Sequence, residues 1–213
     1  MRTDPHPERR PRRRMPAADR MAQIVDTATV LISQRGYWGT AVQDVAEACE
    51  LTVPGLLHHV GSKGGLLIQV LSHRDEADAR ALAELLGLEV SPGEWDPAQL
   101  GVAMREAGIP LATVCDAVVE RNASQPEIVR LYSVLESESL NTEHPGHDYF
   151  RQRQRLALAG FADQAPPGVD AIALAHHVLA VMDGLQVQWL RDPSMDLVAT
   201  WRQVARDIAG LGA

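Results

Sequence analysis

The chain has 213 residues, 46% of them apolar and 23% charged, which is the composition of a soluble globular protein with one large core or two smaller ones. Its net charge of −8 is unevenly spread: residues 1–75 hold ten Lys/Arg against eight Asp/Glu and residues 76–213 hold ten against twenty, so a polyanion partner is expected only for the amino-terminal part. Two distant cysteines, Cys49 and Cys115, exclude a disulfide framework, and the lack of any apolar run of about 20 residues, or of a secretory signal, predicts a cytoplasmic protein without a membrane span.

The first 16 residues, MRTDPHPERRPRRRMP, are basic and proline-rich and contain almost nothing that a core would bury. They predict a disordered basic arm, which is open to two interpretations, a functional arm and a solvated tail. From Ala17 onward, apolar residues recur at steps of three and four as far as Ile32. This period predicts an amphipathic helix that ends near Arg35 and Gly36.

Two short helices joined by a tight turn are expected in the next segment, TAVQDVAEACELTVPGLLHHV. Thr40 is the predicted N-cap of the first helix and Thr52 that of the second, and Pro54 falls in a first turn, where its missing N–H costs little. Gly61 and Ser62 then end the second helix and start a third. Two helices connected in this way form a helix-turn-helix.

A longer helical pattern starts near Ser62 and, at about 25 residues and about 1.5 Å each, would be roughly 35 Å long. It would connect a DNA-binding domain, predicted over residues 17–72, with a larger domain over residues 73–213. The larger domain contains further helical periods near residues 100–105, 111–122, 126–139, 148–163, 169–191 and 195–211. No strand-period segment of useful length occurs, so the sequence predicts an all-α fold.

The second helix of a helix-turn-helix lies in the major groove of DNA, with its amino-terminal turn nearest to the base edges. Thr52 can offer a hydroxyl to a phosphate, and Val53 and Pro54 can contact a thymine methyl group. The helix starts at Thr40 and Ser62 can present backbone amides to phosphates. The predicted DNA-binding residues are Thr40, Gln43, Thr52, Val53, Pro54, Gly55, His58 and Lys63.

These residues carry a resemblance to a known family. The run from Arg20 to Leu71, with QRGYWGTAVQDVAEACELTVPGLLHHVGSKGGLL at its centre, resembles the DNA-binding domain of the TetR (tetracycline-repressor) family of transcriptional regulators. The matching positions are Gly36, Tyr37, Thr40, Thr52, Gly55, His59, Ser62, Lys63, Leu66 and Leu67. The resemblance implies a homodimeric, all-helical regulator that is not an enzyme and needs no cofactor. Its carboxy-terminal domain would bind a small-molecule effector and dimerise.

The sequence also departs from the family at several positions. Glu50 stands where the family usually has a turn glycine, Leu57 where it usually has a DNA-contacting tyrosine, and Val60 where it has a phenylalanine. The missing tyrosine removes one phosphate contact. Gly64 and Gly65 replace helix-favouring residues, and each should weaken the start of the connecting helix by roughly 1 kcal/mol relative to Ala. We therefore expect a DNA-binding domain that pivots freely.

The carboxy-terminal helices contain polar and aromatic residues that interrupt apolar stripes, as the lining of a ligand pocket would. The candidates are Cys115, Asn122, Tyr132, Glu138, Tyr149, Phe150 and His176. A place in the ordinary core or at a helix end is the competing interpretation for each. The resemblance places a dimer interface on the last two helices, where a core within one chain is the alternative. The candidate interface residues are Leu179, Met182, Leu185, Trp189, Trp201, Val204 and Ile208.

The main alternative function is a metal-dependent enzyme or binding protein that uses the region of His144 and His147, with Glu138, Glu143 and Asp148 nearby. No HExxH-type helix spacing supports such a site, so a loop that caps the next helix is favoured over a metal site. The sequence therefore predicts a ligand-responsive regulator that binds double-stranded DNA. Its expected action is that of a repressor released from a palindromic operator by a small molecule.

Overall fold

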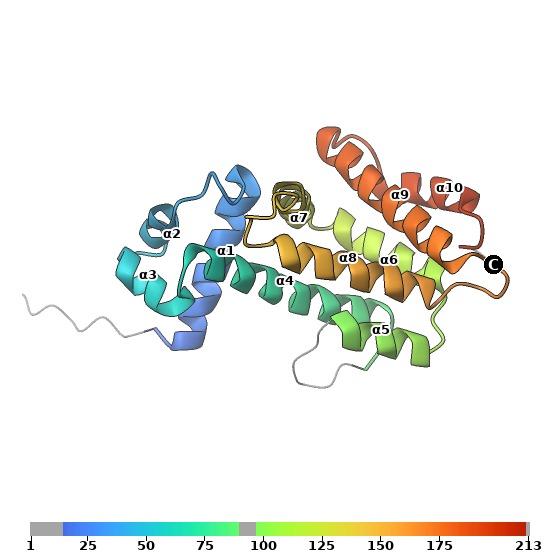
Figure 1. The fold of residues 1–213 in the computed structure, drawn as a ribbon, viewed down its shortest axis with the longest axis horizontal. Coiled ribbons are helices and arrows are strands. Elements are labelled where there is room, and N and C mark those ends of the chain that lie inside the picture. Colours follow the sequence, from blue (N-terminus) through green and yellow to red (C-terminus); the bar gives the residue numbers. More distant parts are fainter. Residues whose placement is uncertain (1–14, 90–96, 212–213) are drawn as a thin grey trace, which may run out of the picture.

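The molecule is an elongated assembly of helices with a small amino-terminal unit at one end (Figure 1). The computed structural model describes residues 15–89 and 97–211, so most of the predicted basic arm, residues 1–14, lies outside the described residues. Within these ranges the chain forms α1 (Ala17–Arg35), α2 (Val42–Ala48), α3 (Val53–Val60), α4 (Lys63–Leu85), α5 (Pro97–Glu106), α6 (Leu111–Ala123), α7 (Pro126–Glu138), α8 (His147–Ala162), α9 (Ala171–Arg191), α10 (Leu197–Val204) and a 3-10 turn (Ala205–Asp207). No strand occurs in the two ranges, which confirms the predicted all-α fold, and no helix there is long and apolar enough to span a bilayer.

The amino-terminal unit consists of α1, α2 and α3, which pack on the first half of α4. One face of α1 is buried, as the sequence period predicts. Its apolar members, each 2% exposed or less, are Ile24, Val25, Ala28 and Ile32. The same buried cluster also contains Leu131 and Leu135 from α7 and Phe150 from α8. The amino-terminal unit and the larger helical part therefore share one core.

Side-chain caps start α3 and α4, as the sequence predicts. Thr52 accepts a hydrogen bond from the backbone N–H of Gly55 at 3.2 Å, and this confirms it as an N-cap. Ser62 does the same for Gly65 at 2.9 Å. Between α2 and α3, Glu50 adopts a left-handed backbone with φ of 54°, a conformation that glycine takes more readily. The turn thus keeps the shape expected of a glycine although a glutamate occupies it.

The predicted N-cap of α2 is wrong by one residue. Ala41 occupies the cap position, and its backbone N–H donates to the carboxylate of Asp44 at 3.2 Å. Thr40 is only 3% exposed, and its hydroxyl donates to the carbonyl oxygen of Gly36 at 2.8 Å. Thr40 therefore closes the connection between α1 and α2, and its hydroxyl proton is already engaged inside the protein.

Gly64 and Gly65 lie in the first turn of α4 because their neighbours leave little room for a side chain. A Cβ atom on Gly65 would lie 2.2 Å from the carbonyl oxygen of Val60, and one on Gly64 would lie 3.3 Å from the Cβ atom of Pro145. The glycines thus admit close packing between α4 and its surroundings. This is the opposite of the expected freedom to pivot, which rested on helix propensity alone.

We expect Gly65→Ala to destabilise the protein by about 1–3 kcal/mol, since the start of α4 would have to shift away from a backbone carbonyl. Gly64→Ala is the matched control, because its methyl group would press only on the side chain of Pro145. Urea unfolding of both variants, compared at equal m values, measures the difference. Equal midpoints for the two variants would contradict this reading of the glycines.

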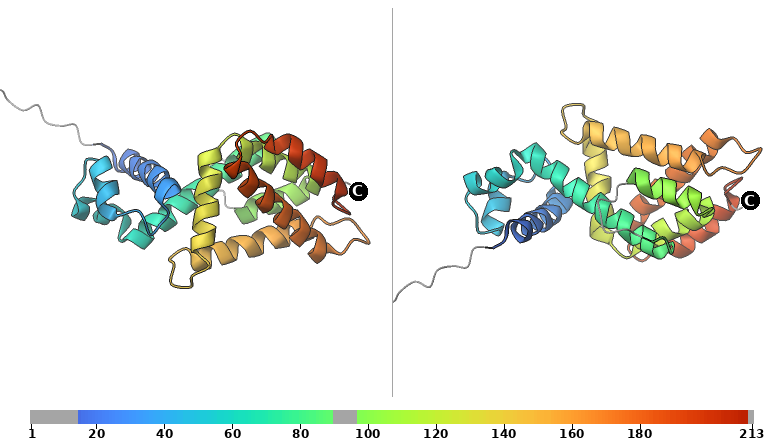
Figure 2. Two further views of the ribbon diagram at one scale, coloured as in Figure 1. Left: turned by 90° about the horizontal axis from the view of Figure 1, so that it is seen from above. Right: turned by 90° about the horizontal axis from the view of Figure 1, so that it is seen from below.

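The α4 helix leaves the amino-terminal unit along the long axis of the molecule and runs along one side of the larger helical part (Figures 1 and 2). The second half of α4 packs on α5 and α6 through Ala79, Leu100 and Val114. A separate buried cluster joins α6, α9 and α10 around residues such as Val178 and Trp201. The α7 helix lies across the long axis, seen end-on in Figure 1 and lengthwise in Figure 2, and contacts both α1 and α9. It therefore connects the amino-terminal unit with the far helices.

Candidate nucleic-acid interface

The outer face of α3 carries the side chains that the sequence assigns to DNA. The exposed members are Thr52, Pro54 and His58, and the half-buried ones are Val53 and Gly55. The inner face is anchored by Leu56 and Val60, which are buried in the core. The amino-terminal turn of α3 is thus accessible, while its core face fixes the helix on the amino-terminal unit.

The start of α2 offers one of the two side chains that the sequence assigns to it. Gln43 lies at the surface, and its amide donates to the carboxylate of Glu47 at 2.6 Å. Thr40 is buried instead, as described above. An exposed ion pair between Arg35 and Asp44, at 3.1 Å, flanks this helix start, and pairs of this kind contribute about 0–1 kcal/mol. The α2 surface can therefore contact a backbone through Gln43 but not through the Thr40 hydroxyl.

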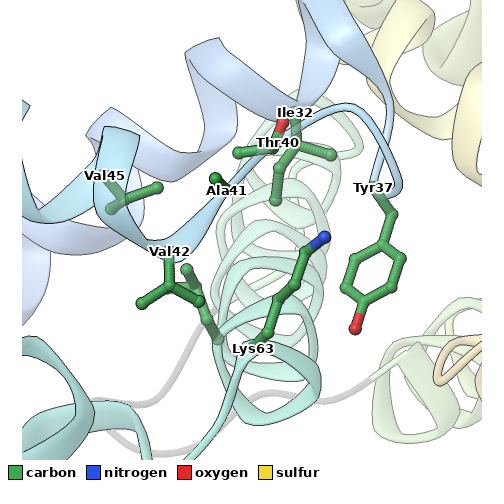
Figure 3. A pocket seen from close by; sticks show the side chains of 8 residues that line it. Ile32, Tyr37, Thr40, Ala41, Val42, Val45 and Lys63 are labelled. Carbon is green, nitrogen blue, oxygen red and sulfur yellow. The ribbon is translucent and has the colours of Figure 1, made fainter. Parts of the chain in front are cut away.

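Lys63 begins α4 and extends toward the ring of Tyr37, at the edge of a small depression that Thr40 and Val42 also line (Figure 3). Its Nζ atom lies 4.4 Å from the centre of the Tyr37 ring, a cation–π contact. Burial raises the pKa of Tyr37, so the ring stays neutral at ordinary pH. The lysine is held beside the amide-rich start of α4, where the helix dipole also favours an anion. Sequence reasoning found Lys63 but missed Tyr37 as its partner.

Three of the predicted pocket residues come together between α4, α7 and α8. Tyr132 donates its hydroxyl hydrogen to Asp75 at 2.8 Å, and Tyr149 donates to the other oxygen of the same carboxylate. Phe150 packs edge-on against both tyrosine rings. Arg153, which sequence reasoning missed, donates to Asp75 at 2.6 Å and lies 4.6 Å from the centre of the Tyr132 ring. Burial raises the pKa of both tyrosines, so they remain hydrogen-bond donors at neutral pH.

Two further carboxylates face Arg153 from α7 and α9. Although both reach solvent, burial against the surrounding helices raises the pKa of Glu136. Burial and the negative charge of Glu136 together raise the pKa of Asp183 to about 6. With Asp75, three carboxylates therefore surround one guanidinium, which makes the local potential negative.

The remaining predicted pocket residues lie elsewhere. Cys115 is buried in the cluster of α6, α9 and α10, where burial raises the pKa of its thiol to about 12. Asn122 donates a hydrogen bond to a glutamine of α9 at 3.3 Å, and His176 is exposed on that helix. Glu138 lies against the amino-terminal unit, where its carboxylate accepts the backbone N–H of Tyr37 at 2.7 Å. The seven candidates therefore do not line one pocket.

The predicted dimer interface is mostly the core of a single chain. The residues that are 8% exposed or less, and belong to the cluster of α6, α9 and α10, are Met182, Leu185, Trp201 and Ile208. Trp201 also donates its indole N–H to Asp116 at 2.7 Å. For these four residues the interface prediction is corrected to an intrachain core. The half-buried Leu179, Trp189 and Val204 stay candidates for contact with a second copy.

The histidines of the metal alternative do not converge. Across residues 15–89 and 97–211, no group of three His, Cys, Asp or Glu side chains is placed to hold a metal ion. His144 is 2% exposed and lies edge-on to the rings of Tyr37 and Trp38. Burial lowers its pKa, so the ring is neutral at neutral pH. The Nδ1 atom of His147 lies instead 2.8 Å from a backbone carbonyl oxygen of the preceding loop.

The sequence of the amino-terminal unit matches a family model. Residues 24–70 match the model described as bacterial regulatory proteins, tetR family. A curated relative is the probable HTH-type transcriptional regulator YttP of Bacillus subtilis (strain 168), which is 28% identical over 60 residues. The aligned segment spans 28% of this chain and 29% of that relative.

The fold of the whole chain is similar to that of several solved regulators. A TetR transcription regulator from Haloarcula marismortui aligns with a TM-score of 0.67 at 16% identity, over 90% of this chain and 97% of that chain. NalD, the secondary repressor of the MexAB-OprM multidrug efflux pump in Pseudomonas aeruginosa, aligns with a TM-score of 0.61 at 20% identity, over 90% and 94%. The fatty acid degradation regulator FadR from Bacillus halodurans aligns with a TM-score of 0.57 at 16% identity, over 91% and 94%. At such identities the likeness shows a shared fold.

The accessible α3, its capped start and the lysine at the start of α4 define a helix-turn-helix DNA-binding protein with an all-helical second part. Residues 24–70 thus match the tetR family of bacterial regulatory proteins, and the whole chain shares its fold with solved regulators of that kind. The resemblance seen in the sequence is thereby confirmed. The metal-dependent alternative is not favoured.

Proposed function

We propose that the protein is a repressor that binds a palindromic operator as a homodimer and leaves the operator when a small molecule binds to its larger helical part. The observation that carries the DNA-binding step is the accessible amino-terminal turn of α3, together with the capped start of α4. Both helix starts present backbone amides, and Lys63 adds a positive charge, so a phosphate backbone fits there. Two copies would place their α3 helices in successive major grooves, about 34–36 Å apart.

Within this proposal, α3 reads the DNA with its first two turns. Thr52 lies at the start, where its hydroxyl can reach a phosphate, and Pro54 and the half-buried Val53 meet thymine methyl groups. His58 is exposed one turn further and can reach a base edge or a phosphate. Leu57, where the family usually has a tyrosine, packs partly against the core and makes no phosphate contact.

The effector site is proposed at the aromatic group of Tyr132, Tyr149 and Phe150. Asp75, to which both tyrosines donate, belongs to α4, the helix that begins with Lys63 at the DNA-facing end. A ligand that replaces these contacts would tilt α4 and change the spacing of the two α3 helices. Since a ligand shifts an equilibrium only by its difference in affinity for the two states, the effector should bind the DNA-free form more tightly.

Lys63→Ala should weaken binding to all duplexes alike and lower the slope of log K against log salt by about 0.9, because one phosphate contact is lost. Arg80→Ala is the matched control, since it removes the same charge from the exposed surface of α4, about 25 Å further along the helix. Fluorescence anisotropy at several salt concentrations gives both slopes. Lys63 is also the only lysine in the sequence, so amine labelling with and without DNA, read on the peptide that contains it, reports on protection of this one side chain. Identical slopes for the two variants would remove Lys63 from the interface.

Selection of bound duplexes from a random pool tests the function as a whole. We expect a palindromic consensus that binds two copies of the chain. A purified protein that stays monomeric and retains no duplex at modest ionic strength would overturn the proposal.

A further inference from the structure

The end of α7 reaches across to the connection between α1 and α2. One carboxylate oxygen of Glu138, the last residue of α7, accepts the backbone N–H of Tyr37 at 2.7 Å, although the two residues are 101 positions apart. The other oxygen lies against Gly36, where a Cβ atom would be only 2.3 Å away from it. Gly36 also has a φ of 71°, a left-handed conformation that suits glycine. The carboxylate of Glu138 therefore packs closely against the backbone of Gly36 and Tyr37.

The loop after α7, residues 139–146, which we call the junction loop, places His144 next to the same connection. The ring of His144 lies 4.9 Å from that of Tyr37 and 5.8 Å from that of Trp38, in both cases edge to face. Its Nδ1 atom accepts the backbone N–H of Gly146, so the neutral ring carries its proton on Nε2. That Nε2 has no hydrogen-bond partner within the described chain and lies 3.8 Å from the carboxylate of Glu138. The histidine thus fills the space behind the Glu138 contact.

The ring of Tyr37 lies between the Glu138 contact and Lys63, on the surface proposed to face DNA. Tyr37, whose N–H is held by Glu138, carries the ammonium group of Lys63 on its ring at 4.4 Å. Next to it, Pro145 of the junction loop packs on Gly64, the residue that follows Lys63 in α4. The end of α7 and the junction loop therefore support the very segment that is proposed to bind a phosphate.

Different contacts hold the amino-terminal unit against α7 and set its orientation. Leu131 and Leu135 of α7 belong to the core shared with α1, and this apolar contact holds the two parts together. Apolar contact has little directional preference, whereas a hydrogen bond between a carboxylate and an amide N–H fixes an angle as well as a distance. The core accounts for adhesion between the parts, and the Glu138 contact for their relative orientation.

We propose that Glu138 is a positioning residue that holds the amino-terminal unit, and with it α3 and Lys63, in the orientation needed for the operator. This inference rests on the DNA-binding function proposed above. A dimer must present two α3 helices at one spacing to bind the operator. If the amino-terminal unit takes up other orientations, only a fraction of the dimers can bind, and the apparent affinity for the operator falls by that fraction. Because α7 also contacts α9, a shift of the far helices reaches the amino-terminal unit through this residue.

The test compares the full chain with Glu138→Ala, with Glu138→Gln, which keeps an oxygen to accept the Tyr37 N–H, and with Glu127→Ala. Glu127 is the matched control because it is an exposed glutamate of the same helix, paired only locally with Arg130. Urea unfolding establishes that each variant is folded. Amide hydrogen exchange at Tyr37 then reports on the contact itself. Binding to a duplex selected from a random pool, measured at several salt concentrations, reports on positioning.

For Glu138→Ala we expect amide exchange at Tyr37 to be about tenfold faster, as the loss of a hydrogen bond to a charged group implies. Operator affinity should fall about fivefold, with an unchanged salt slope because no phosphate contact is lost. Glu138→Gln should retain most of the amide protection at Tyr37 and most of the operator affinity. Glu127→Ala should equal the wild type in both measurements. Equal operator affinity of Glu138→Ala and the wild type, or unchanged exchange at Tyr37, overturns this inference alone. A wild-type chain that binds no duplex overturns the proposed function, and this inference with it.

Discussion

Trp201→Ala is expected to lower the free energy of unfolding by about 3–5 kcal/mol, the cost of emptying the site of a fully buried tryptophan. The side chain is 1% exposed and lies in the cluster that joins α6, α9 and α10. Its indole N–H also donates to Asp116 at 2.7 Å, so the substitution removes a hydrogen bond to a carboxylate together with the apolar contacts. Chemical unfolding followed by circular dichroism measures the loss.

Trp201→Phe separates the two contributions, because it keeps an aromatic ring in the core and removes only the indole N–H and part of the volume. Its expected loss is about 1.5–3 kcal/mol, the range of one hydrogen bond to a charged group. The pair of variants also decides between an intrachain core and a dimer interface. A Trp201→Ala protein that unfolds at the wild-type midpoint but has lost its dimer would restore the interface prediction for this residue.

The sequence predicts the helices well because the signals that set them are local. The period of α1 and the caps at Thr52 and Ser62 depend on residues within four positions of one another, and the structure confirms them. The predicted start of α2 is wrong by one residue, and the reason is equally local. Asp44 can cap Ala41 from within the helix, and this leaves the Thr40 hydroxyl to bond with Gly36. Two capping solutions were available to the same segment, and pattern alone did not choose between them.

Long-range contacts explain what the sequence missed. Helix propensity predicts a loose start for α4 at Gly64 and Gly65, but Val60 and Pro145 occupy the space where side chains would lie. Likewise, the amphipathic stripes of the last two helices indicate which face is buried without indicating whether the partner belongs to the same chain. Trp201 turned out to face α6 of its own chain.

One missed group did leave a signal in the sequence. The buried stripe of α4 runs to Leu71 and resumes at Ala79, and the turn between them has Asp75 and Asp78 on the inner side. Charged residues that fall on an otherwise apolar face need partners in the fold. Asp78 is paired with Arg121 at 2.6 Å and also accepts a hydrogen bond from the Gln125 amide at 3.1 Å, whereas the partners of Asp75 come from α7 and α8. The gap in the stripe predicts that such partners exist, although not which residues they are.

Asp75→Ala is the second substitution with a large expected effect, a loss of about 3 kcal/mol in the free energy of unfolding. The carboxylate is 12% exposed and accepts hydrogen bonds from Tyr132, Tyr149 and Arg153, so its removal leaves three donors without their acceptor. The estimate lies at the lower end for a buried ion pair because Arg153 is 44% exposed and can turn to water. Glu76→Ala, on the exposed side of the same turn of α4, is the matched control. Urea unfolding of the two variants measures the difference.

A double-mutant cycle with Arg153→Leu shows how the loss arises. The cost of Asp75→Ala is expected to come mainly from the guanidinium of Arg153, which loses its carboxylate partner. In that case the loss of stability in the double variant should be smaller than the sum of the two single-variant losses by about 1 kcal/mol or more. Strictly additive losses would mean that Asp75 and Arg153 act independently. Tyr132 and Tyr149 would then be the main partners of the carboxylate, and hydrogen bonds from their neutral hydroxyl groups would hold α4 against α7 and α8. In either case the proposed effector site depends on Asp75, because it is the α4 residue to which both tyrosines and the arginine of this site donate.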